Sequence, residues 1–292
     1  RERWRDMSFL FEEPVAGFEP GLAAGLDNDS AAGDPLAFVF VGERLVLQPD
    51  SDRPMSLSEA RAAGMLLSDL TPLGRLDGRV CVVAATSEPL PEGFKARVVR
   101  KLFGRLELNA IAVAAYASQI AHFVTTHRFC GMCGGPMVAS ASERLVRCER
   151  CQRDVYPRVS PCIIILIHDG SRILLTRAAH FPEGMYGLVA GFVEPGESLE
   201  QCAHREVLEE TGIRISDVRY VASQPWPFPS QLMVGFTARF ESGELTVDKH
   251  ELEDANWFEL DALPQIPPPL SIARHLIDLH LEARSSATEP AQ

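Results

Sequence analysis

The sequence predicts an α/β protein made of three folded parts, and three observations carry this prediction. After Pro161, strand-like and helix-like patterns alternate, which indicates an α/β sandwich. A short cysteine-rich segment precedes this region, and a longer stretch with both strand and helix patterns comes first. The 292 residues also exceed what most single hydrophobic cores accommodate. We therefore expect an α+β domain over residues 1–127, a cysteine segment over 128–156, an α/β domain over 157–285 and a flexible tail over 286–292.

The N-terminal part has strand and helix patterns but no recognisable site motif. Alternating apolar residues predict a hairpin with strands at 38–41 and 45–47, and a further strand at 79–85. Helical spacing follows from Phe94 to Leu102 and from Ile111 to Phe123. The uncharged stretch Leu108–His127 is interrupted by polar residues, so we interpret it as a buried or partner-facing helix and not as a membrane span.

Composition and charge narrow the class of protein. The chain is 46% hydrophobic and 23% charged, which is ordinary for a globular protein. Its formal net charge of -12 argues against a broad electrostatic grip on nucleic acid, although a local basic site is compatible with it. The first fourteen residues lack the apolar core of a secretory signal, so we expect a cytoplasmic protein without a membrane partner.

Four of the seven cysteines form two C-x-x-C pairs: Cys130 with Cys133, and Cys148 with Cys151. Each pair presents two thiolates to one point, which is the ligand arrangement of tetrahedral Zn²⁺. This spacing disfavours the alternative of four unrelated buried thiols, and the odd total suits a reducing cytosol better than a disulfide framework. Because sulfur fills all four positions, the predicted zinc is structural and is not the reaction centre.

The elements of the α/β part follow in order. Strands are predicted at 162–167 and 172–176, around a turn at 169–171. A helix begins near Leu199, strands are expected at 231–240 and 255–258, and a last helix over 271–283 follows the proline run 267–269.

The helix that begins near Leu199 carries paired carboxylates. Ser198 and Gln201 have the spacing of a capping box, and Gly212 is a typical helix end. Glu206, Glu209 and Glu210 stand at i, i+3 and i+4, hence on one face. Carboxylates this close repel one another unless a hard cation such as Mg²⁺ or Mn²⁺ joins them, and such a cation can activate water for attack at phosphorus. The alternative is a solvated, charged helix end.

A proline-aromatic segment, Ser223–Ser230, follows this helix. Alternating prolines stiffen an extended chain, so Trp226 and Phe228 are presented with little entropy left to lose. Rigid aromatic side chains near a phosphate site are suited to stacking on a base or on nicotinamide. The alternative is a loop packed on the core.

Gly191–Ile213 matches every defined position of a long motif: Gly, five residues, Glu, seven residues, Arg-Glu, an aliphatic residue, any residue, Glu-Glu, any residue, Gly and an aliphatic residue. This pattern resembles the Nudix box. Together with the cysteine pairs and the Ser223–Ser230 segment, it makes residues 122–280 similar to the NADH pyrophosphatase branch of the Nudix hydrolases, some of which remove NAD caps from RNA. Ser160 and Leu270 depart from that branch, where an acidic residue and a glycine are common.

The resemblance implies a Nudix α/β/α sandwich, a homodimer, and hydrolysis of the pyrophosphate of NADH or NAD⁺ to AMP and nicotinamide mononucleotide. It implies that Mg²⁺ or Mn²⁺ is bound by the Ala190 carbonyl and by Glu206, Glu209, Glu210 and Glu251, with Glu210 as the base. Phe192 is expected to stack on nicotinamide. The remaining residues implied at the dinucleotide are Glu143, Tyr156, Gln224, Pro225, Trp226, Pro227, Phe228, Pro229, Ser230, Gln231 and Ala273.

Two alternatives stay open from the sequence. The substrate of the same reaction could be ADP-ribose, FAD or a diadenosine polyphosphate. A non-catalytic nucleotide- or RNA-binding protein is the second, but a binder has no need for self-repelling carboxylates. An NAD-capped RNA partner could be contacted by ribbon arginines, namely Arg144, Arg147, Arg150 and Arg153.

Overall fold

The computed structural model describes residues 15–22, 33–49, 51, 53–102 and 105–288, and these residues form two compact units. One contains residues 15–158 and Pro227–Ser230; the other contains Val159–Trp226 and residues 231–288. Among the described residues, no helix is both long and apolar enough to cross a membrane.

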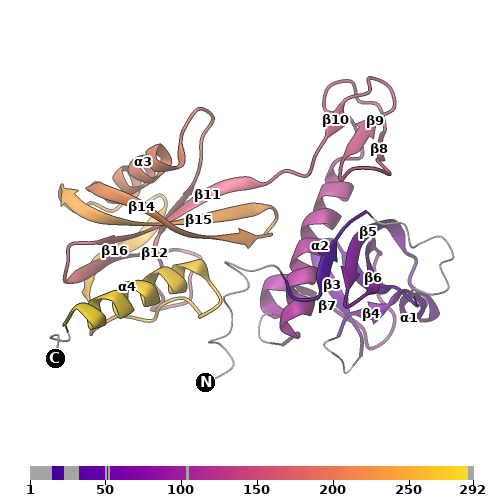
Figure 1. Cartoon of the computed structure of the whole chain (residues 1–292), viewed down its shortest axis with the longest axis horizontal. Helices are drawn as coiled ribbons and strands as arrows, with labels where there is room; N and C mark the ends of the chain where they lie inside the picture. The colour runs from indigo at the N-terminus through magenta and orange to yellow at the C-terminus, as the bar shows by residue number, and fades with distance from the viewer. Residues whose placement is uncertain (1–14, 23–32, 50, 52, 103–104, 289–292) are drawn as a thin grey trace. The chain divides into compact units, whose positions relative to one another are not determined.

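The first unit contains a mixed sheet with the strand order β1-β5-β6-β2-β3-β7, and β4 pairs with β2 (Figure 1). The predicted hairpin and the predicted strand at 79–85 are confirmed. The strands are β1 Phe18–Pro20, β2 Leu36–Val41, β3 Arg44–Leu47, β4 Met55–Ser56, β5 Ser68–Leu76, β6 Arg79–Ala85 and β7 Lys95–Val98. The helical segments are α1 Leu57–Ala62, the 3-10 helix η3 Val99–Leu102 and α2 Leu108–Thr126.

The prediction of a helix from Phe94 is wrong for its first half. Residues 95–98 form β7, which pairs antiparallel with β3 and places Arg97 opposite Leu45, and only a 3-10 turn follows. Pairing with β7 provides hydrogen-bond partners for the backbone N–H and C=O groups at the edge of β3. The stability gained from these bonds outweighs the local preference of residues 95–98 for a helix. The helix predicted over 111–123 is confirmed as α2, whose Ile111, Ala114 and Ala117 are buried in the core of this unit. This burial supports the interpretation of α2 as an intramolecular helix.

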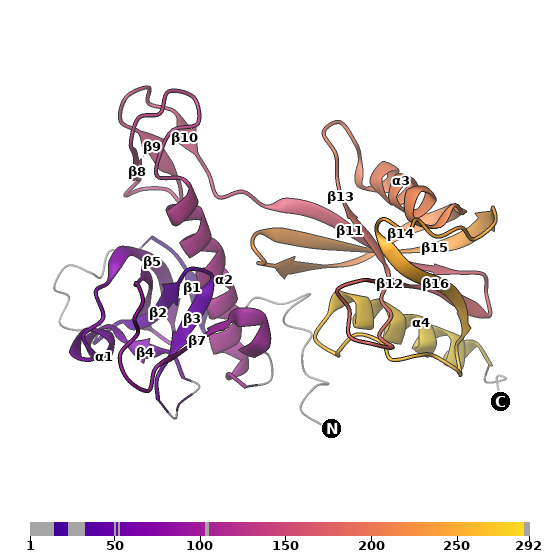
Figure 2. The same cartoon turned by 180° about the vertical axis from the view of Figure 1, so that it is seen from behind.

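The cysteine segment forms a small antiparallel sheet in the order β10-β9-β8, which we call the ribbon (Figure 2). Its strands are β8 Met137–Ala139, β9 Val146–Cys148 and β10 Asp154–Val155. Strands of two or three residues bury little apolar surface, so this sheet requires another source of stability.

The second unit is the expected α/β/α sandwich. Its sheet has the order β14-β15-β11-β12-β16, with β13 paired to β11, and only the β11–β15 pair is parallel among the pairs of this sheet. The strands are β11 Ser160–His168, β12 Arg172–Ala178, β13 Val189–Phe192, β14 Arg214–Trp226, β15 Gln231–Ser242 and β16 Leu252–Glu259; the helices are α3 Leu199–Thr211 and α4 Ile272–Thr288.

Strand β11 shows how the two helices share the sheet. Ile163, Ile165 and Ile167 pack in a cluster with residues of α3, whereas Cys162, Ile164 and Leu166 pack with residues of α4. Because successive side chains of a strand point to opposite faces, α3 and α4 cover opposite faces of the sheet, as Figure 1 shows. A strand buried on both faces reads as a continuous apolar run, which is why 162–167 was recognisable in the sequence.

Candidate active site

Two glutamates of α3 point into the protein instead of toward solvent. The helix begins at a capping box between Ser198 and Gln201 and ends at Gly212, whose φ of 71° is the left-handed value that glycine adopts most easily. Glu206 and Glu210 lie one turn apart on it and are only 8% and 6% exposed. The predicted capping residues are therefore confirmed, and the burial of these two carboxylates contradicts the alternative of a solvated helix end.

A third carboxylate, Glu251, reaches the same place from a distant part of the sequence. The backbone N–H of Asp248 donates to the Glu210 carbonyl at 3.0 Å, and that of Thr246 donates to the Thr211 carbonyl at 2.9 Å. These bonds hold the segment before β16 against the last turn of α3. As a result, carboxylate oxygens of Glu206, Glu210 and Glu251 lie within 4.8 Å of one another. We call these three residues the glutamate cluster.

Glu209 lies outside this cluster. Its side chain is 58% exposed and accepts a hydrogen bond from Arg205 Nη1 at 3.0 Å. At 100° per residue, Glu206 and Glu210 are closer to the buried centre of the helix face, while Glu209 lies at its margin. A metal contact by Glu209 therefore stays a prediction.

Arg205 ties the preceding loop to the helix. Its guanidinium donates to both carboxylate oxygens of Glu197, at 2.6 and 2.8 Å, and to the Phe192 carbonyl at 2.9 Å. It also donates to Glu206 at 2.8 Å. These hydrogen bonds lower the pKa of Glu197 to about 2. The Arg205–Glu197 pair fixes β13, the loop and α3 as one frame.

Charge within the cluster is unfavourable without a cation. Burial raises the pKa of Glu210 to about 8, and the charges of Glu206 and Glu251 add to this shift. Burial also raises the pKa of Glu206, against the lowering effect of Arg205. Buried carboxylates that share one point offer the hard oxygen ligands that Mg²⁺ and Mn²⁺ prefer, so the residues fit such a cation.

The stability of the metal-free protein is expected to fall as the pH rises from 5 to 8. The ordinary pKa of a glutamate is 4.5, and that of Glu210 in the folded protein is about 8. Between these two pKa values the folded state keeps a proton that the unfolded state releases. The stability that this proton contributes decreases through that range and is lost once the pH exceeds about 8. Thermal unfolding of this unit, followed with and without excess Mg²⁺, checks the prediction. A transition midpoint that is independent of pH in the metal-free protein would contradict it.

Gly191 of β13 leaves room for the cluster. A Cβ atom at this position would lie only 1.9 Å from Cδ and 2.1 Å from Oε1 of Glu206. Contacts this short cannot exist, so glycine is required for Glu206 to keep its position. Ala190, whose carbonyl is a predicted metal ligand, precedes Gly191 in the same strand and pairs with Ile164 of β11.

Substitution of Gly191 with alanine is expected to displace Glu206, because the added methyl group would occupy its position. We therefore expect weaker Mn²⁺ binding and a kcat at least about tenfold lower for the hydrolysis that the Nudix box predicts. The control is Gly42→Ala, at a turn of the other unit: an added Cβ atom there would have no neighbouring atom within 4 Å, and the φ of 57° strains the backbone without touching the glutamate cluster. Calorimetric titration with Mn²⁺ distinguishes the two variants. Equal Mn²⁺ affinity in both would show that Glu206 is free to move.

The four paired cysteines meet at one point in the ribbon. The Sγ atoms of Cys130 and Cys151 are 3.7 Å apart, and those of Cys133 and Cys148 are 3.5 Å apart. A tetrahedron with Zn–S bonds of about 2.3 Å has edges of about 3.8 Å, whereas a disulfide requires about 2.05 Å. The geometry therefore fits a closed four-thiolate zinc site and not two disulfides.

Comparison with known proteins agrees with both sites. The family described as "NADH pyrophosphatase zinc ribbon domain" matches residues 125–156, and the "NUDIX domain" family matches residues 157–279. A curated relative from Pseudomonas aeruginosa (strain LESB58), "NAD-capped RNA hydrolase NudC", is 44% identical over 219 residues, which are 75% of this chain and 79% of the relative. The chain belongs to the NudC family of Nudix hydrolases.

A second curated relative agrees with this assignment. The NudC of Stutzerimonas stutzeri (strain A1501) is 43% identical over 75% of this chain and 79% of its own. Among solved structures, a Nudix hydrolase from Nitrosomonas europaea is 25% identical and covers 56% of this chain and 95% of its own, with a TM-score of 0.48.

The remaining residues that the NudC resemblance implies are distributed over both units. In the first unit, Tyr156 Oη donates to Glu143 Oε2 at 2.7 Å, so these two predicted residues are brought together. In the second unit, Phe192 is 50% exposed at the end of β13, and Trp226 and Ala273 pack in one hydrophobic cluster. The sequence did not single out Asp248, whose backbone positions Glu251 and whose charge raises the pKa of Glu210. Its only signal is its place in the acidic run 248–254.

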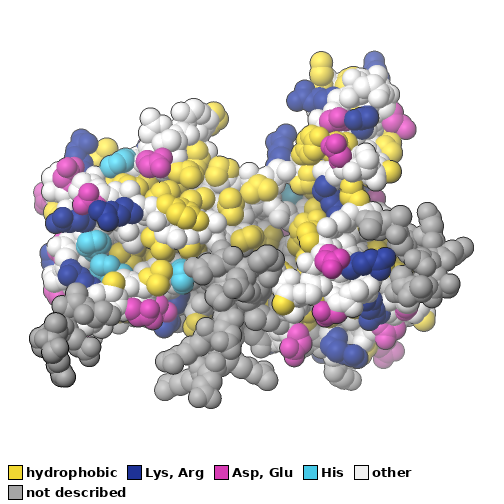
Figure 3. Space-filling model, viewed as in Figure 1, with side chains coloured by type: hydrophobic (Ala, Val, Ile, Leu, Met, Phe, Trp, Pro, Cys, Tyr) yellow, Lys and Arg dark blue, Asp and Glu magenta, His cyan; other side chains and the backbone are white. Residues whose placement is uncertain are grey.

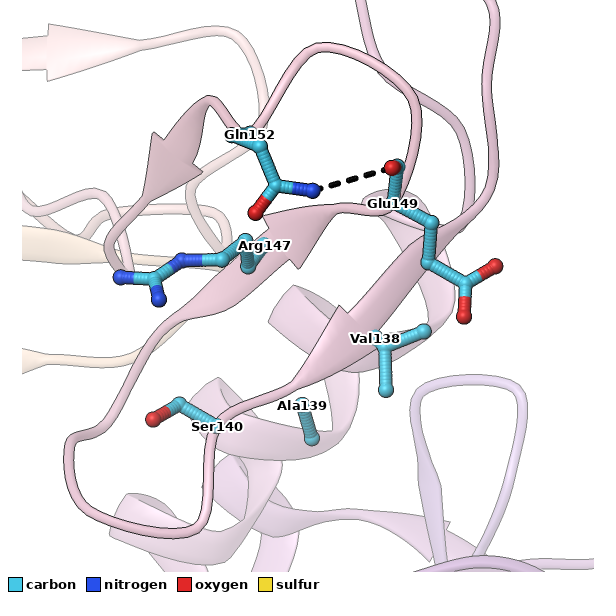
Figure 4. Close-up of a pocket in the computed structure, with 6 residues that line it drawn as sticks. All are labelled: Val138, Ala139, Ser140, Arg147, Glu149 and Gln152. Atoms are coloured by element: carbon cyan, nitrogen blue, oxygen red, sulfur yellow. Dashed lines mark hydrogen bonds between the residues drawn. The ribbon is translucent and has the colours of Figure 1, made fainter.

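Two of the four ribbon arginines, Arg144 and Arg147, make contacts within their own unit. Arg144 donates to the carbonyls of Pro72 and Gly21 and lies over the Tyr116 ring, so it serves the packing of its own unit. Arg147 makes two hydrogen bonds to Asp154, at 2.6 and 2.8 Å. Its side chain lines a pocket of the ribbon together with Ser140 and Gln152 (Figure 4). The guanidinium of Arg144 is therefore engaged within its own unit, and contact of the ribbon arginines with RNA stays a prediction.

Exposed apolar side chains also mark the ribbon. Phe129 is 74% exposed and Met132 72%. Figure 3 shows hydrophobic and basic side chains side by side over the ribbon. Surfaces of this kind occur at contacts with other macromolecules.

Proposed function

We propose that this NudC-family chain hydrolyses the pyrophosphate of NADH and NAD⁺ and releases AMP and the corresponding nicotinamide mononucleotide. The observation that carries this proposal is the glutamate cluster: Glu206 and Glu210 are buried within the Nudix box, and the exposed Glu251 joins them from outside it. The Nudix domain also follows directly on the zinc ribbon of NADH pyrophosphatases. Carboxylates at this spacing are suited to divalent cations, and such cations can bridge phosphate oxygens.

The residues of the site have separate roles in this reaction: metal binding, proton transfer and positioning. Divalent cations, when bound, would supply positive charge that stabilises the phosphate oxygens and lowers the pKa of water. Glu206, Glu210 and Glu251, with Glu209 and the Ala190 carbonyl, would hold them. Glu210 accepts the proton of the attacking water, whose oxygen forms a bond to one phosphorus as the bond to the bridging oxygen breaks. Arg205 keeps Glu206 and the loop in place during this step.

We expect the chain to hydrolyse the same pyrophosphate bond in RNA that carries an NAD cap. Hydrolysis there releases nicotinamide mononucleotide and leaves a 5′-monophosphate on the RNA. The curated relatives of this chain carry the name NAD-capped RNA hydrolase, which supports this second substrate.

The nucleotide is held by the residues that the family resemblance implies. Phe192 stacks on nicotinamide, and the segment from Pro225 to Gln231, Ala273, Glu143 and Tyr156 line the rest of the dinucleotide site. The exposure of Phe192 and the hydrogen bond between Tyr156 and Glu143 support these assignments. Zn²⁺ in the ribbon is structural, and Mg²⁺ or Mn²⁺ is the catalytic ion.

The enzyme acts as a cytoplasmic homodimer. Active sites shared between two copies are the expectation that the family resemblance brings, and the exposed apolar side chains of the ribbon support a macromolecular contact. Light scattering of the purified protein at several concentrations tests the dimer.

The decisive experiment measures turnover of NADH and of NAD-capped RNA in Mg²⁺ or Mn²⁺, with products identified by chromatography. AMP and reduced nicotinamide mononucleotide are the expected products from NADH. ADP-ribose, FAD and diadenosine polyphosphates complete the panel, and a higher kcat/KM for one of them would replace NADH as the substrate. Absence of cleavage with zinc bound would favour a nucleotide- or RNA-binding role.

A further inference from the structure

Gln224 of β14 is the one polar residue of the Ser223–Ser230 segment that the structure buries almost completely. Its exposed fraction is 1%. Its Nε2 donates to the Leu270 carbonyl at 2.9 Å, and its Oε1 accepts from the backbone N–H of Ile272, also at 2.9 Å. Both ends of the amide are therefore engaged by the main chain, and no exposed surface is left to meet a ligand.

The two partners of Gln224 flank the start of α4. The first N–H groups of a helix have no acceptor within the helix, and Gln224 supplies one for Ile272 from a neighbouring strand. Ser271 supplies another, because its Oγ accepts from the N–H of Arg274 at 3.3 Å. The proline run 267–269 that precedes these residues can donate no backbone N–H to the Leu270 carbonyl, and Gln224 Nε2 supplies that donor. Gln224 is thus the side chain that joins the start of α4 to the sheet.

Two residues that the family resemblance implies at the dinucleotide lie close to these hydrogen bonds: Trp226 on β14 and Ala273 on α4. Trp226 stands two residues beyond Gln224 in a regularly paired part of β14, and therefore on the same face of the sheet. Trp226, Ile272 and Ala273 pack in one hydrophobic cluster. A shift of the start of α4 would change the distance between Trp226 and Ala273.

We infer that Gln224 is a positioning residue and not a substrate ligand: its buried amide locks the start of α4 to β14 and sets the spacing of Trp226 and Ala273. This inference rests on the proposed function only in placing Trp226 and Ala273 at the dinucleotide. The lock itself rests on two hydrogen bonds and on burial.

The test combines hydrogen exchange and kinetics on the zinc-loaded full chain. Gln224→Met keeps the length of the side chain but removes both hydrogen bonds, and leaves two buried main-chain groups without partners. Amide exchange over residues 270–276 of the ligand-free protein is expected to rise at least about tenfold. KM for NADH is expected to rise by about as much, with kcat and Mn²⁺ activation nearly unchanged, because the glutamate cluster is not involved.

Two further variants make the result interpretable. Gln224→Asn keeps a neutral amide but is one methylene shorter, so it cannot reach both main-chain partners; an intermediate effect is expected and covers the case in which Gln224→Met does not fold. Gln265→Met makes the same change at an exposed glutamine of the same unit and is expected to alter neither exchange nor KM.

Three outcomes overturn the inference. A raised KM with unchanged exchange over 270–276 makes Gln224 a direct ligand. Faster exchange that extends equally to α3 makes its role one of general stability. Faster exchange over 270–276 with an unchanged KM removes its link to the substrate. Wild-type protein that fails to hydrolyse NADH overturns the proposed function instead, while the exchange comparison still tests the lock.

Discussion

Replacement of Glu210 with glutamine is expected to lower kcat for NADH hydrolysis by about 10²- to 10⁴-fold while dinucleotide binding is largely kept. Glutamine has nearly the same volume as glutamate, so the packing of α3 is preserved. Its amide can neither accept the proton of the attacking water nor contribute an anionic oxygen to the metal. The loss therefore falls on the chemical step.

The Glu210→Gln substitution is also expected to change the stability of the metal-free protein, because Glu210 is a buried carboxylate beside other carboxylates. Because burial and neighbouring charges raise the pKa of Glu210 to about 8, its ionised form destabilises the metal-free protein near this pH. Glu210→Gln removes that charge. The variant is expected to unfold at a higher temperature than wild type in the absence of metal, and to gain less from added Mg²⁺. Opposite effects on activity and on metal-free stability distinguish a functional carboxylate from a structural one.

Two matched substitutions on the same helix serve as comparisons. Glu200→Gln changes an exposed carboxylate of the first turn and is expected to retain wild-type kcat. Glu209→Gln tests the prediction that the exposed neighbour of the cluster also binds metal; if it does, a higher Mn²⁺ concentration is needed for half-maximal activity. Survival of full activity in Glu210→Gln would require another base, and Glu251 would be the first to test.

The parts of the fold that the sequence predicted are those with local causes. The start and end of α3 follow from Ser198, Gln201 and Gly212, which act within one or two turns of the chain. Strand β11 was recognisable because burial on both faces requires a continuous apolar run. The C-x-x-C pairs likewise carry their geometry in their spacing, and the structure places their sulfurs accordingly.

What the sequence missed depends on long-range pairing. Strand β14 has irregular burial and several register shifts against β15, so no period-2 pattern marks it. Residues 95–98 became a strand because the β3 edge needed a partner. Glu251 joins the cluster through backbone hydrogen bonds from 246 and 248 to the end of α3, and no local pattern encodes these. The identity of Glu251 came from the family resemblance alone.

Removal of zinc is expected to unfold the ribbon. Its strands contain two or three residues each, and such a sheet cannot offset the conformational entropy lost on folding. Binding of Zn²⁺ to four thiolates provides about 10–16 kcal/mol in small zinc domains. Cys148→Ser replaces a fully buried ligand and should abolish stoichiometric zinc binding. Zinc content by atomic emission and hydrogen exchange over residues 128–156 measure the two effects.

The consequence for activity depends on which residues the ribbon carries. Glu143 and Tyr156 belong to the ribbon, and their mutual hydrogen bond is lost when it unfolds. The glutamate cluster belongs to the other unit and keeps its own framework of Arg205 and the capped α3. Cys148→Ser is therefore expected to raise KM for NADH more than it lowers kcat. Cys81→Ala, which changes a buried single cysteine of the N-terminal sheet, is the control and should keep its zinc. A zinc-free variant whose ribbon amides stay protected and whose KM equals that of wild type would show that the thiolates stabilise this part of the chain without metal.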